Sequence, residues 1–141
     1  MPAYFDSSVL LSLLVGDAHA HRARDLWHEE SERVSSTLLE VECRTVLRRL
    51  PQAGVSEAAR RGAERRLDAA LEEVTIKPLD EQIAVMVRDT FQLGGCRALD
   101  AAHLATALYF RDAADPDLLL CTFDTRMAEI AARVGLRAVG A

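Results

Sequence analysis

A continuous apolar run at residues 118–123, with the sequence Leu-Leu-Leu-Cys-Thr-Phe, limits the possible folds of this chain more than any other feature. A strand that faces water on one side alternates polar and apolar residues, whereas such a run is typical of a strand buried on both faces. Other short apolar segments alternate with segments of helical periodicity, which predicts an α/β fold with a mainly parallel sheet. The expected strands are residues 3–5, 33–35, 74–76, 118–123 and 137–139, and the expected helices are residues 7–15, 18–32, 37–50, 56–72, 80–93, 99–112 and 125–134.

The length of 141 residues corresponds to one domain, which we expect to span residues 1–141. A domain of this size can bury enough surface to fold without a disulfide or a structural metal. The cysteines Cys43, Cys96 and Cys121 lie far apart and form no Cys-x-x-Cys pair, so we expect reduced thiols. No basic segment precedes an apolar run at the N-terminus, and no apolar stretch approaches the ~20 residues of a membrane span. We therefore expect a cytoplasmic protein with no membrane partner.

The net charge of −5 argues at first against a nucleic-acid partner, but the basic residues are unevenly distributed. Lys77 is the only lysine among the 17 basic residues, and arginine matches phosphate and carboxylate geometry better than lysine does. Two interpretations of a local arginine cluster stay open: a helical face in contact with water, or a surface for phosphates or an acidic partner. The cluster comprises Arg44, Arg48, Arg49, Arg60, Arg61, Arg65 and Arg66.

Two aspartates, Asp6 and Asp124, each follow an apolar strand and precede a helix. Ligands of parallel sheets bind beyond the carboxyl ends of the strands, so both positions are candidates for a functional site. Aspartate is also a good helix cap, which is the alternative interpretation of both residues. Asp100 falls in the first turn of the expected helix at 99–112, where the helix dipole alone would favour an acid. His103, about one turn later, is expected to be a buried structural histidine, with a substrate contact as the alternative.

Glu40 and Glu42 flank the apolar side of the expected helix at 37–50, so periodicity does not distinguish them. Glu40 has Arg44 four residues later, which makes an ordinary exposed helical pair. Glu42 has Val46 at that distance and therefore lacks such a partner. This difference favours Glu42 as the acid that points inward.

A cluster of carboxylates would carry specific chemistry if these acids met in the fold. Two like charges 4 Å apart repel by about 4 kcal/mol at an effective dielectric constant of 20. Such a cluster is stable only if some acids are protonated or a cation lies among them, and oxygen ligands suit Mg²⁺ or Mn²⁺. A bound ion lowers the pKa of its water and stabilises the charge on a leaving oxygen. The predicted reaction is attack by metal-activated water, and no residue pattern indicates a covalent nucleophile.

Taken together, four segments resemble PIN domains, and within them the VapC-type toxins of bacterial toxin–antitoxin pairs. The resemblance runs in the right order from about residue 3 to residue 139, and its most specific part is the stretch at 99–107. The segments are Tyr4-Phe5-Asp6-Ser7-Ser8, then Ser35-Ser36-Thr37-Leu38-Leu39 followed by Glu42, then Leu99-Asp100-Ala101-Ala102-His103-Leu104-Ala105-Thr106-Ala107, and finally Thr122-Phe123-Asp124.

The resemblance implies a three-layer α/β/α PIN-like fold, as a single PIN-like domain over residues 1–141 with a central, mainly parallel sheet of four to five strands. Ser8 and Thr122 are similar to the family's small hydroxyl residues that support the acids or the metal-bound water. Arg97 lies where relatives vary, so a substrate contact there stays open. The acids implied to be catalytic and to bind the metal are Asp6, Glu42, Asp100 and Asp124.

The function that the resemblance implies is a Mg²⁺- or Mn²⁺-dependent endoribonuclease that acts as the toxin of a toxin–antitoxin pair. Its partners would be an RNA substrate and a cognate antitoxin, which would cover the exposed edges of the helices before residue 72. The chain would form a homodimer, or a heterotetramer or larger assembly with the antitoxin.

Three other functions stay open. One is a PIN nuclease that processes RNA without being a toxin, and another is a catalytically inactive PIN domain that only binds. The third is a phosphatase with Asp6 as the nucleophile. Such a phosphatase usually needs a second acid two residues later, where this chain has Ser8.

Overall fold

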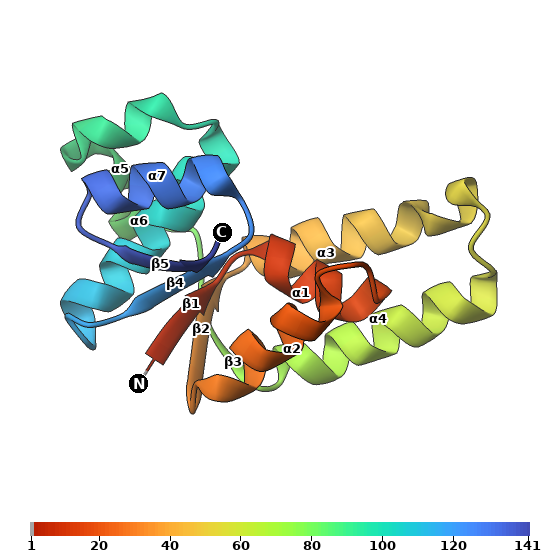
Figure 1. Ribbon diagram of the computed structural model, residues 1–141. Coiled ribbons are helices and arrows are strands. Elements are labelled where there is room, and N and C mark those ends of the chain that lie inside the picture. The colour runs from red at the N-terminus through yellow and green to blue at the C-terminus, as the bar shows by residue number, and fades with distance from the viewer. Residues whose placement is uncertain (1) are drawn as a thin grey trace.

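The computed structural model describes residues 2–141 as a sheet covered by helices (Figure 1). The elements are β1 (Pro2–Phe5), α1 (Ser7–Val15), α2 (Ala20–Glu29), β2 (Glu32–Ser36), α3 (Leu38–Arg49), the 3₁₀ helix η1 (Leu50–Ala53), α4 (Glu57–Leu71), β3 (Val74–Lys77), α5 (Glu81–Asp89), the 3₁₀ helix η2 (Phe91–Gly95), α6 (Ala98–Ala113), β4 (Leu119–Thr122), α7 (Thr125–Arg133) and β5 (Arg137–Gly140).

The sheet has five parallel strands in the order β3-β2-β1-β4-β5. This confirms the prediction of an α/β fold with a mainly parallel sheet of four to five strands. The order changes direction at β1, since β2 and β3 extend to one side of it and β4 and β5 to the other. The crevice between β1 and β4 is therefore the topological switch point, where open α/β sheets bind ligands.

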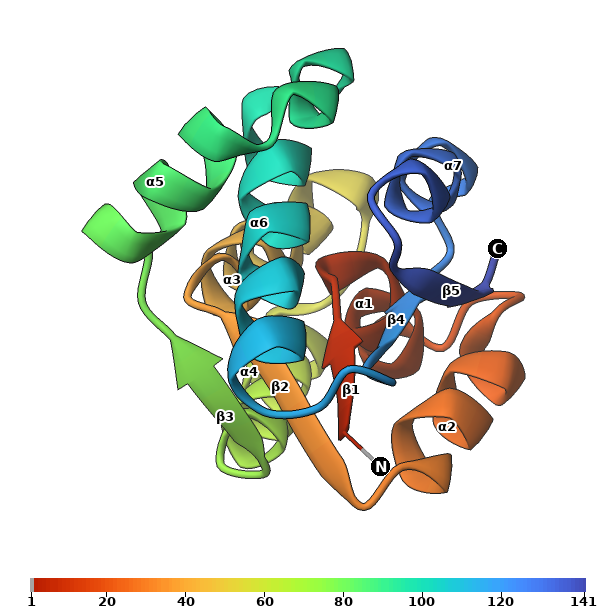
Figure 2. The same ribbon diagram turned by 90° about the vertical axis from the view of Figure 1, so that its left-hand side faces the viewer.

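Helices cover both faces of the sheet, so the three-layer α/β/α arrangement is confirmed (Figures 1 and 2). Successive side chains of a strand point to opposite faces, and this divides the core in two. Phe5 packs with α1–α4 on one face, whereas Tyr4 packs with α5–α7 on the other. Trp27 of α2 lies against Phe5 with ring centroids 4.8 Å apart. Both faces of β1 are thus buried, as its apolar sequence predicts.

Two helices, α2 and α5, are each five residues shorter than predicted. The expected helix at 18–32 is reduced to α2, because the chain turns into β2 at its end. The expected helix at 80–93 ends four residues early: Thr90 leaves the helical region with φ −115° and ψ 84°, and η2 follows. Because of this break, Phe91 is 94% exposed. The prediction of one helix over 80–93 is wrong at its C-terminal end.

The three cysteines are free, as expected. Cys43 and Cys121 are buried in the core, and Cys96 is partly exposed. In the part of the chain that the structure describes, residues 2–141, no helix is both long and apolar enough to cross a membrane. Packing and hydrogen bonds, rather than disulfides, hold the described elements together.

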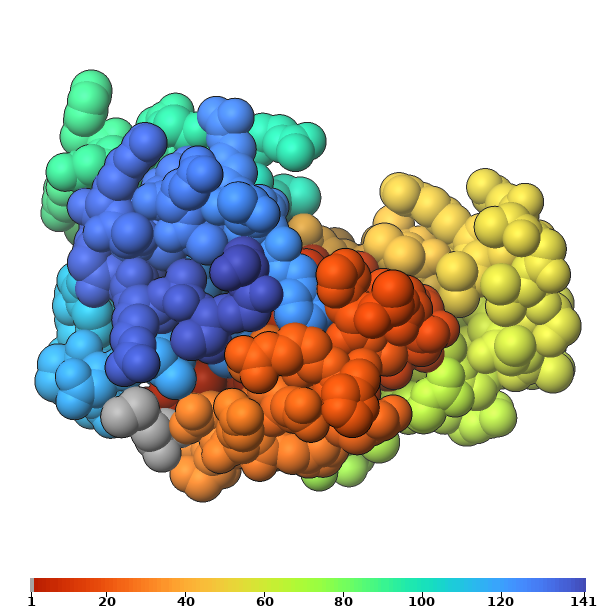
Figure 3. All heavy atoms as spheres, in the orientation of Figure 1, coloured from red at the N-terminus to blue at the C-terminus, as the bar shows by residue number. Residues whose placement is uncertain are grey.

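Helices α3 and α4 form an arm that projects from the rest of the molecule (Figure 3). Glu64 of α4 lies between the two helices and accepts hydrogen bonds from Arg44 at 3.1 Å, from Arg48 at 3.0 Å and from Arg60. Its side chain is only 11% exposed. Arg44 also bonds to Asp68. Two of the clustered arginines, Arg44 and Arg48, therefore join α3 to α4, a role that neither open interpretation of the cluster included, and Arg60 supports Glu64 from the same helix.

We expect Glu64→Ala to destabilise the protein by about 1–3 kcal/mol, since it removes charge-assisted hydrogen bonds from three arginines. The matched control is Glu57→Ala, which removes an acid that is 59% exposed and pairs with Arg60 alone. Exposed pairs of this kind contribute little to stability. Urea unfolding followed by circular dichroism measures both changes, and equal small effects would show that Glu64 does not hold the arm.

Candidate active site

The four predicted acids come from four elements around the switch point. Asp6 follows β1, Asp124 follows β4, Asp100 lies in the first turn of α6, and Glu42 lies in the middle of α3. Three of them line one cavity of about 370 Å³, here named the acidic cavity. Asp6 is only 3% exposed and does not line it. The residues that line the acidic cavity are Glu42, Arg97, Ala98, Leu99, Asp100 and Asp124.

Asp6 is held by hydrogen bonds from both sides of the switch point. Ser8 donates to its Oδ1 from the backbone N at 3.1 Å and from Oγ at 2.6 Å. Thr122 donates to Oδ2 from Oγ1 at 2.6 Å. The same two hydroxyls accept from the next segment, Ser8 from the N of Phe123 and Thr122 from the N of Asp124. The structure thus brings Ser8 and Thr122 to Asp6, and Thr122 connects Asp6 to Asp124.

Burial raises the pKa of Asp6, although hydrogen bonds from Ser8 and Thr122 partly offset this effect. Burial also raises the pKa of Asp100, and the neighbouring charge of Asp124 adds to the increase. Glu42 raises the pKa of Asp100 further. The acids of the cavity therefore act on one another electrostatically, as a cluster of carboxylates must.

Glu42 is oriented by a buried histidine. His103, 1% exposed, lies with Nε2 2.5 Å from Glu42 Oε1 and with Nδ1 2.7 Å from the hydroxyl of Tyr4. Burial raises the pKa of Tyr4, so its phenol stays protonated and can donate to Nδ1. With the phenol as the donor to Nδ1, the proton of the ring lies on Nε2, from which it is donated to the carboxylate of Glu42. Glu40 instead pairs with Arg44, as predicted.

The prediction of a buried histidine is confirmed, but its contact with Glu42 had no sequence signal. His103 and Glu42 are 61 residues apart in the chain, and His103 and Tyr4 are 99 apart. The periodicity of one helix does not indicate which residues of other helices or strands its side chains contact. The only available hint was that Glu42 has no arginine partner on its own helix.

The capping interpretation of the strand-end aspartates also holds. Asp6 is the N-cap of α1, and Asp124 is the N-cap of α7, where its Oδ1 accepts from the N of Met127 at 3.0 Å. Capping does not exclude a place in the site, because Asp124 also lines the acidic cavity. Among residues 2–141, Asp100 has no described side-chain hydrogen bond. The two interpretations that the sequence left open for Asp6 and Asp124 are therefore compatible.

A metal ion can be tested against these residues by donor type and by geometry. Only carboxylates offer strong ligands in the acidic cavity, and oxygen donors with shared negative charge suit Mg²⁺ or Mn²⁺. A cation would relieve the repulsion between Asp100 and Asp124. Over residues 2–141, however, no group of three or more His, Cys, Asp or Glu side chains could hold a metal ion in the arrangement found. The residues fit by chemistry, and a complete ligand set requires side-chain movement.

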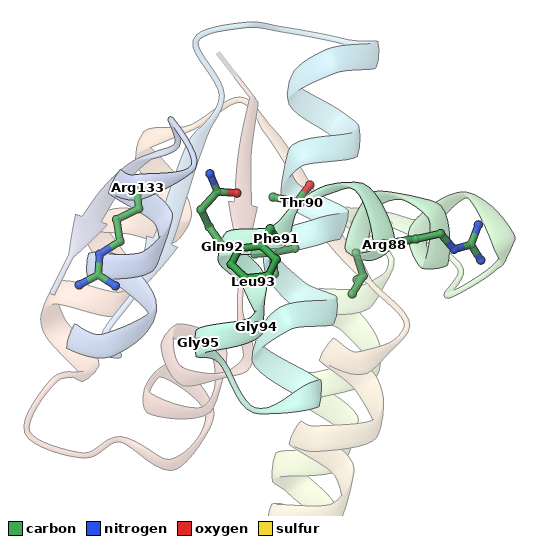
Figure 4. Close-up of a pocket in the computed structure, with 9 residues that line it drawn as sticks. Arg88, Thr90, Phe91, Gln92, Leu93, Gly94, Gly95 and Arg133 are labelled. Atoms are coloured by element: carbon green, nitrogen blue, oxygen red, sulfur yellow. The ribbon is translucent and has the colours of Figure 1, made fainter.

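A larger hollow of about 550 Å³ lies away from the acids, between α5, η2 and α7 (Figure 4). Its lining includes Arg88, Phe91 and Arg133 but no carboxylate. It therefore lacks the groups that would activate water or bind a cation. Size alone does not locate the candidate active site in this molecule.

The fold and the site define a class: three-layer α/β/α proteins with an acidic cavity at the switch point of a parallel sheet. The chain belongs to the PIN domain family, whose model matches residues 3–133. It is 32% identical over 139 residues to ribonuclease VapC46 of Mycobacterium tuberculosis, an alignment that covers 96% of this chain and 95% of the relative. The resemblance to VapC-type PIN domains is thereby confirmed.

Solved structures share the fold. A toxin–antitoxin complex from Klebsiella pneumoniae matches with a TM-score of 0.68 and 24% identity, covering 98% of this chain and 96% of that chain. PAE2754 from Pyrobaculum aerophilum matches with a TM-score of 0.64 and 17% identity, covering 99% and 92%. VapBC2 from Rickettsia felis, bound to a DNA fragment from its promoter, matches with 0.64 and 11% identity, covering 98% and 97%. At these identities the matches support the fold alone.

Proposed function

We propose that this chain is a Mg²⁺- or Mn²⁺-dependent endoribonuclease and the toxin of a toxin–antitoxin pair. The observation that carries the proposal is the meeting of Glu42, Asp100 and Asp124 in one cavity, with Asp6 joined to Asp124 through Thr122. The similarity to a VapC ribonuclease over nearly the whole chain supports RNA as the substrate. The domain is proposed to comprise residues 1–141 and to act in the cytoplasm.

In the proposed reaction, Asp6, Glu42, Asp100 and Asp124 would hold the metal. When bound, Mg²⁺ or Mn²⁺ lowers the pKa of water and offsets negative charge at the phosphate. Ser8 and Thr122 fix Asp6 by hydrogen bonds, so that its carboxylate keeps one orientation. In this proposal the side chains of the protein orient the acids and supply charge, and none of them forms a covalent intermediate with the RNA.

Two further side chains complete the proposed site. His103 fixes the carboxylate of Glu42 by a hydrogen bond. Arg97 lines the cavity and lies close enough to lower the pKa of Asp100 in part, so it can attract the RNA phosphate. His103 thus fixes a negative charge, and Arg97 supplies a positive one. Fixed charges of this kind are a common means of stabilising the transition state of a reaction.

The proposed protein partners are a cognate antitoxin and a second copy of the chain, in a homodimer or in a heterotetramer or larger assembly. Two structural neighbours are described as toxin–antitoxin or VapBC complexes, which supports an antitoxin. Phe91, 94% exposed, and Val87, 38% exposed, line the same hollow, which lies outside the helices before residue 72 that the resemblance implied as the antitoxin surface. Apolar side chains exposed together are common where another protein binds.

A second candidate is a catalytically inactive PIN domain that only binds its partner. The observation in its favour is that no metal-binding group of three side chains is formed in residues 2–141. A PIN nuclease that processes RNA outside any toxin–antitoxin pair has the same expected chemistry as the toxin. A small antitoxin gene next to the gene for this chain would support the toxin role.

The test of the proposed activity is a titration of antitoxin-free protein with Mn²⁺ or Mg²⁺ that measures cleavage of several RNAs. We expect cleavage only with metal, and a decrease of at least about 10²-fold in Asp100→Asn, since a charged group of the site is removed. Asp112→Asn, on the same helix but paired with Arg111 at its other end, is the matched control and should cleave normally. Folded wild type that neither binds metal nor cleaves RNA would favour the binding module.

A further inference from the structure

A second hollow, of about 280 Å³, adjoins the acidic cavity along helix α3. The two share Glu42 and Leu99, which line both. We name the second hollow the α3 groove. It is lined by Ser7, Leu11, Val41, Glu42, Thr45, Val46, Arg49 and Leu99.

Half of the side chains that line the α3 groove are apolar, and two of these are exposed. Val41 is 54% exposed and Leu99 is 50% exposed, although both lie next to charged acids. Leu11 and Val46 add partly buried apolar surface. Exposed apolar side chains gathered in a concave site are typical of a surface that a ligand covers. The volume is small, which suits one planar ring better than a large ligand.

Arg49 stands at the far end of the α3 groove. Arg44 and Arg48, its neighbours on the helix, are bonded to Glu64, whereas Arg49 forms no ion pair within the described residues 2–141. Glu42 and Arg49 are seven residues apart, so they are separated by about 10 Å along the helix axis. The positive charge of Arg49 therefore lies at the end of the groove that is farther from the acids, and its guanidinium group is available to bind a phosphate.

We propose that the α3 groove binds the nucleobase next to the phosphodiester that is cleaved, and that Arg49 binds the phosphate beyond that base. The inference rests on the ribonuclease activity proposed for the acidic cavity and extends it to the path of the RNA strand. Apolar contact with a base face is favourable for every base, and it is a common means of holding single-stranded RNA. Continuity through Glu42 and Leu99 places the groove directly beside the phosphate to be cut.

The same arrangement orients the strand. Arg97 lines the acidic cavity, and Arg49 lines the α3 groove. The strand therefore passes from Arg97 across the acids and through the apolar groove to Arg49. Val41, Val46 and Leu99 contact the base and so determine which bases are accepted at this position.

The first test compares Val46→Trp, which fills the groove, with wild type on two RNAs in the presence of Mn²⁺. One RNA is intact, and the other has an abasic residue next to the mapped cleavage site, placed on each side in turn. We expect wild type to cut the intact RNA at least tenfold faster than the abasic RNA on one side. Val46→Trp should cut both at the same low rate, because the two changes remove one interaction and are not additive.

The second test concerns the cation. Arg49→Gln should reduce cleavage of the intact RNA several-fold and lower the slope of log binding constant against log salt by about 0.7, the loss of one phosphate contact to a single strand. Arg61→Gln is the matched control, because Arg61 is another exposed arginine of the arm without a described ion pair in residues 2–141. It should change neither quantity.

Separate outcomes distinguish the inference from the activity on which it depends. If wild type cuts no RNA, the proposed function fails first. If wild type cuts RNA but Val46→Trp and Arg49→Gln cut like wild type, the groove inference is overturned. It is also overturned if the variants cut RNA normally and lose only antitoxin binding, because the groove then holds a peptide. Thermal unfolding and Mn²⁺ affinity, both expected to be unchanged in Arg49→Gln, confirm that the fold and the acidic cavity are intact.

Discussion

Asp6→Asn is expected to abolish metal-dependent RNA cleavage, by at least about 10²-fold, while the chain stays folded. The substitution removes one negative charge from the group of acids but keeps the size of the side chain. Its Oδ1 can still accept from the N and Oγ of Ser8. Its amide replaces the oxygen that now accepts from Thr122, so one hydrogen bond must rearrange. The expected loss is therefore one of charge and metal binding rather than of fold.

The stability of Asp6→Asn gives a second readout, and its sign follows from the pKa of Asp6. Burial raises this pKa above its ordinary value of 3.8, so the ionised carboxylate destabilises the folded state. This loss of folding stability is absent below pH 3.8, the ordinary pKa, and grows as the pH rises towards the raised pKa of Asp6 in the folded protein. Asparagine carries no charge, so Asp6→Asn avoids this destabilisation. In EDTA, the variant should unfold at the same temperature as wild type or higher at pH 7.5, and the difference should shrink at pH 4.

The matched control for Asp6→Asn is Asp80→Asn. Asp80 is also an aspartate N-cap, of α5, where its side chain accepts from the N of Gln82. Asparagine caps helices as well as aspartate does, so neither variant should lose its cap. Only Asp6→Asn should lose cleavage. Strong destabilisation of Asp6→Asn together with retained metal-dependent cleavage would mean that Asp6 serves as a cap alone.

His103→Leu is expected to weaken Mn²⁺ binding and RNA cleavage together, by about 10–100-fold, as is usual when a group that orients a metal ligand is lost. The leucine cannot donate to Glu42, and it leaves the hydroxyl of Tyr4 without its present acceptor. The carboxylate of Glu42 is then free to take several orientations. Isothermal titration with Mn²⁺ measures the first effect without any need for cleavage.

A purely structural role for His103 makes a different prediction. His103→Gln keeps an amide donor that can reach Glu42, so it should restore most of the Mn²⁺ affinity lost in His103→Leu. Tyr4→Phe removes only the hydroxyl at Nδ1 and should produce a smaller loss of the same kind. If all three variants lose stability but bind Mn²⁺ like wild type, His103 supports the core and does not position Glu42.

Local patterns predicted several features of the site correctly. Apolar runs that end at Asp6 and Asp124 placed these residues at the carboxyl ends of strands, where the structure has them. The spacing of Glu40 to Arg44 separated the paired acid from Glu42, and the ion pair is present. These signals are reliable because helix and strand periods involve residues near in sequence.

Phe91 illustrates where a local pattern fails. It falls on the four-residue steps of a helix predicted over 80–93, yet the helix ends at Asp89 and Phe91 is exposed. The chain turns at Thr90, and Leu93 of η2 then fills the core instead. Leu93 packs in the core with residues of α6 and α7, and the periodicity of a single segment carries no information about such partners.

The sequence by itself determined the α/β class, the parallel sheet and the acids at the strand ends, because these depend on short-range periodicity and on which residues follow each strand. Only the tertiary structure decided that β1 lies beside β4, which brings Asp6 to Thr122, 116 residues away. It also joined Glu42 to His103 and enclosed Glu64 among three arginines. The physical reason is that strand order and side-chain pairing between elements follow from the burial of the whole core. A single helix or strand cannot bury its apolar face by itself. The sequence of that segment therefore does not indicate which other elements it contacts.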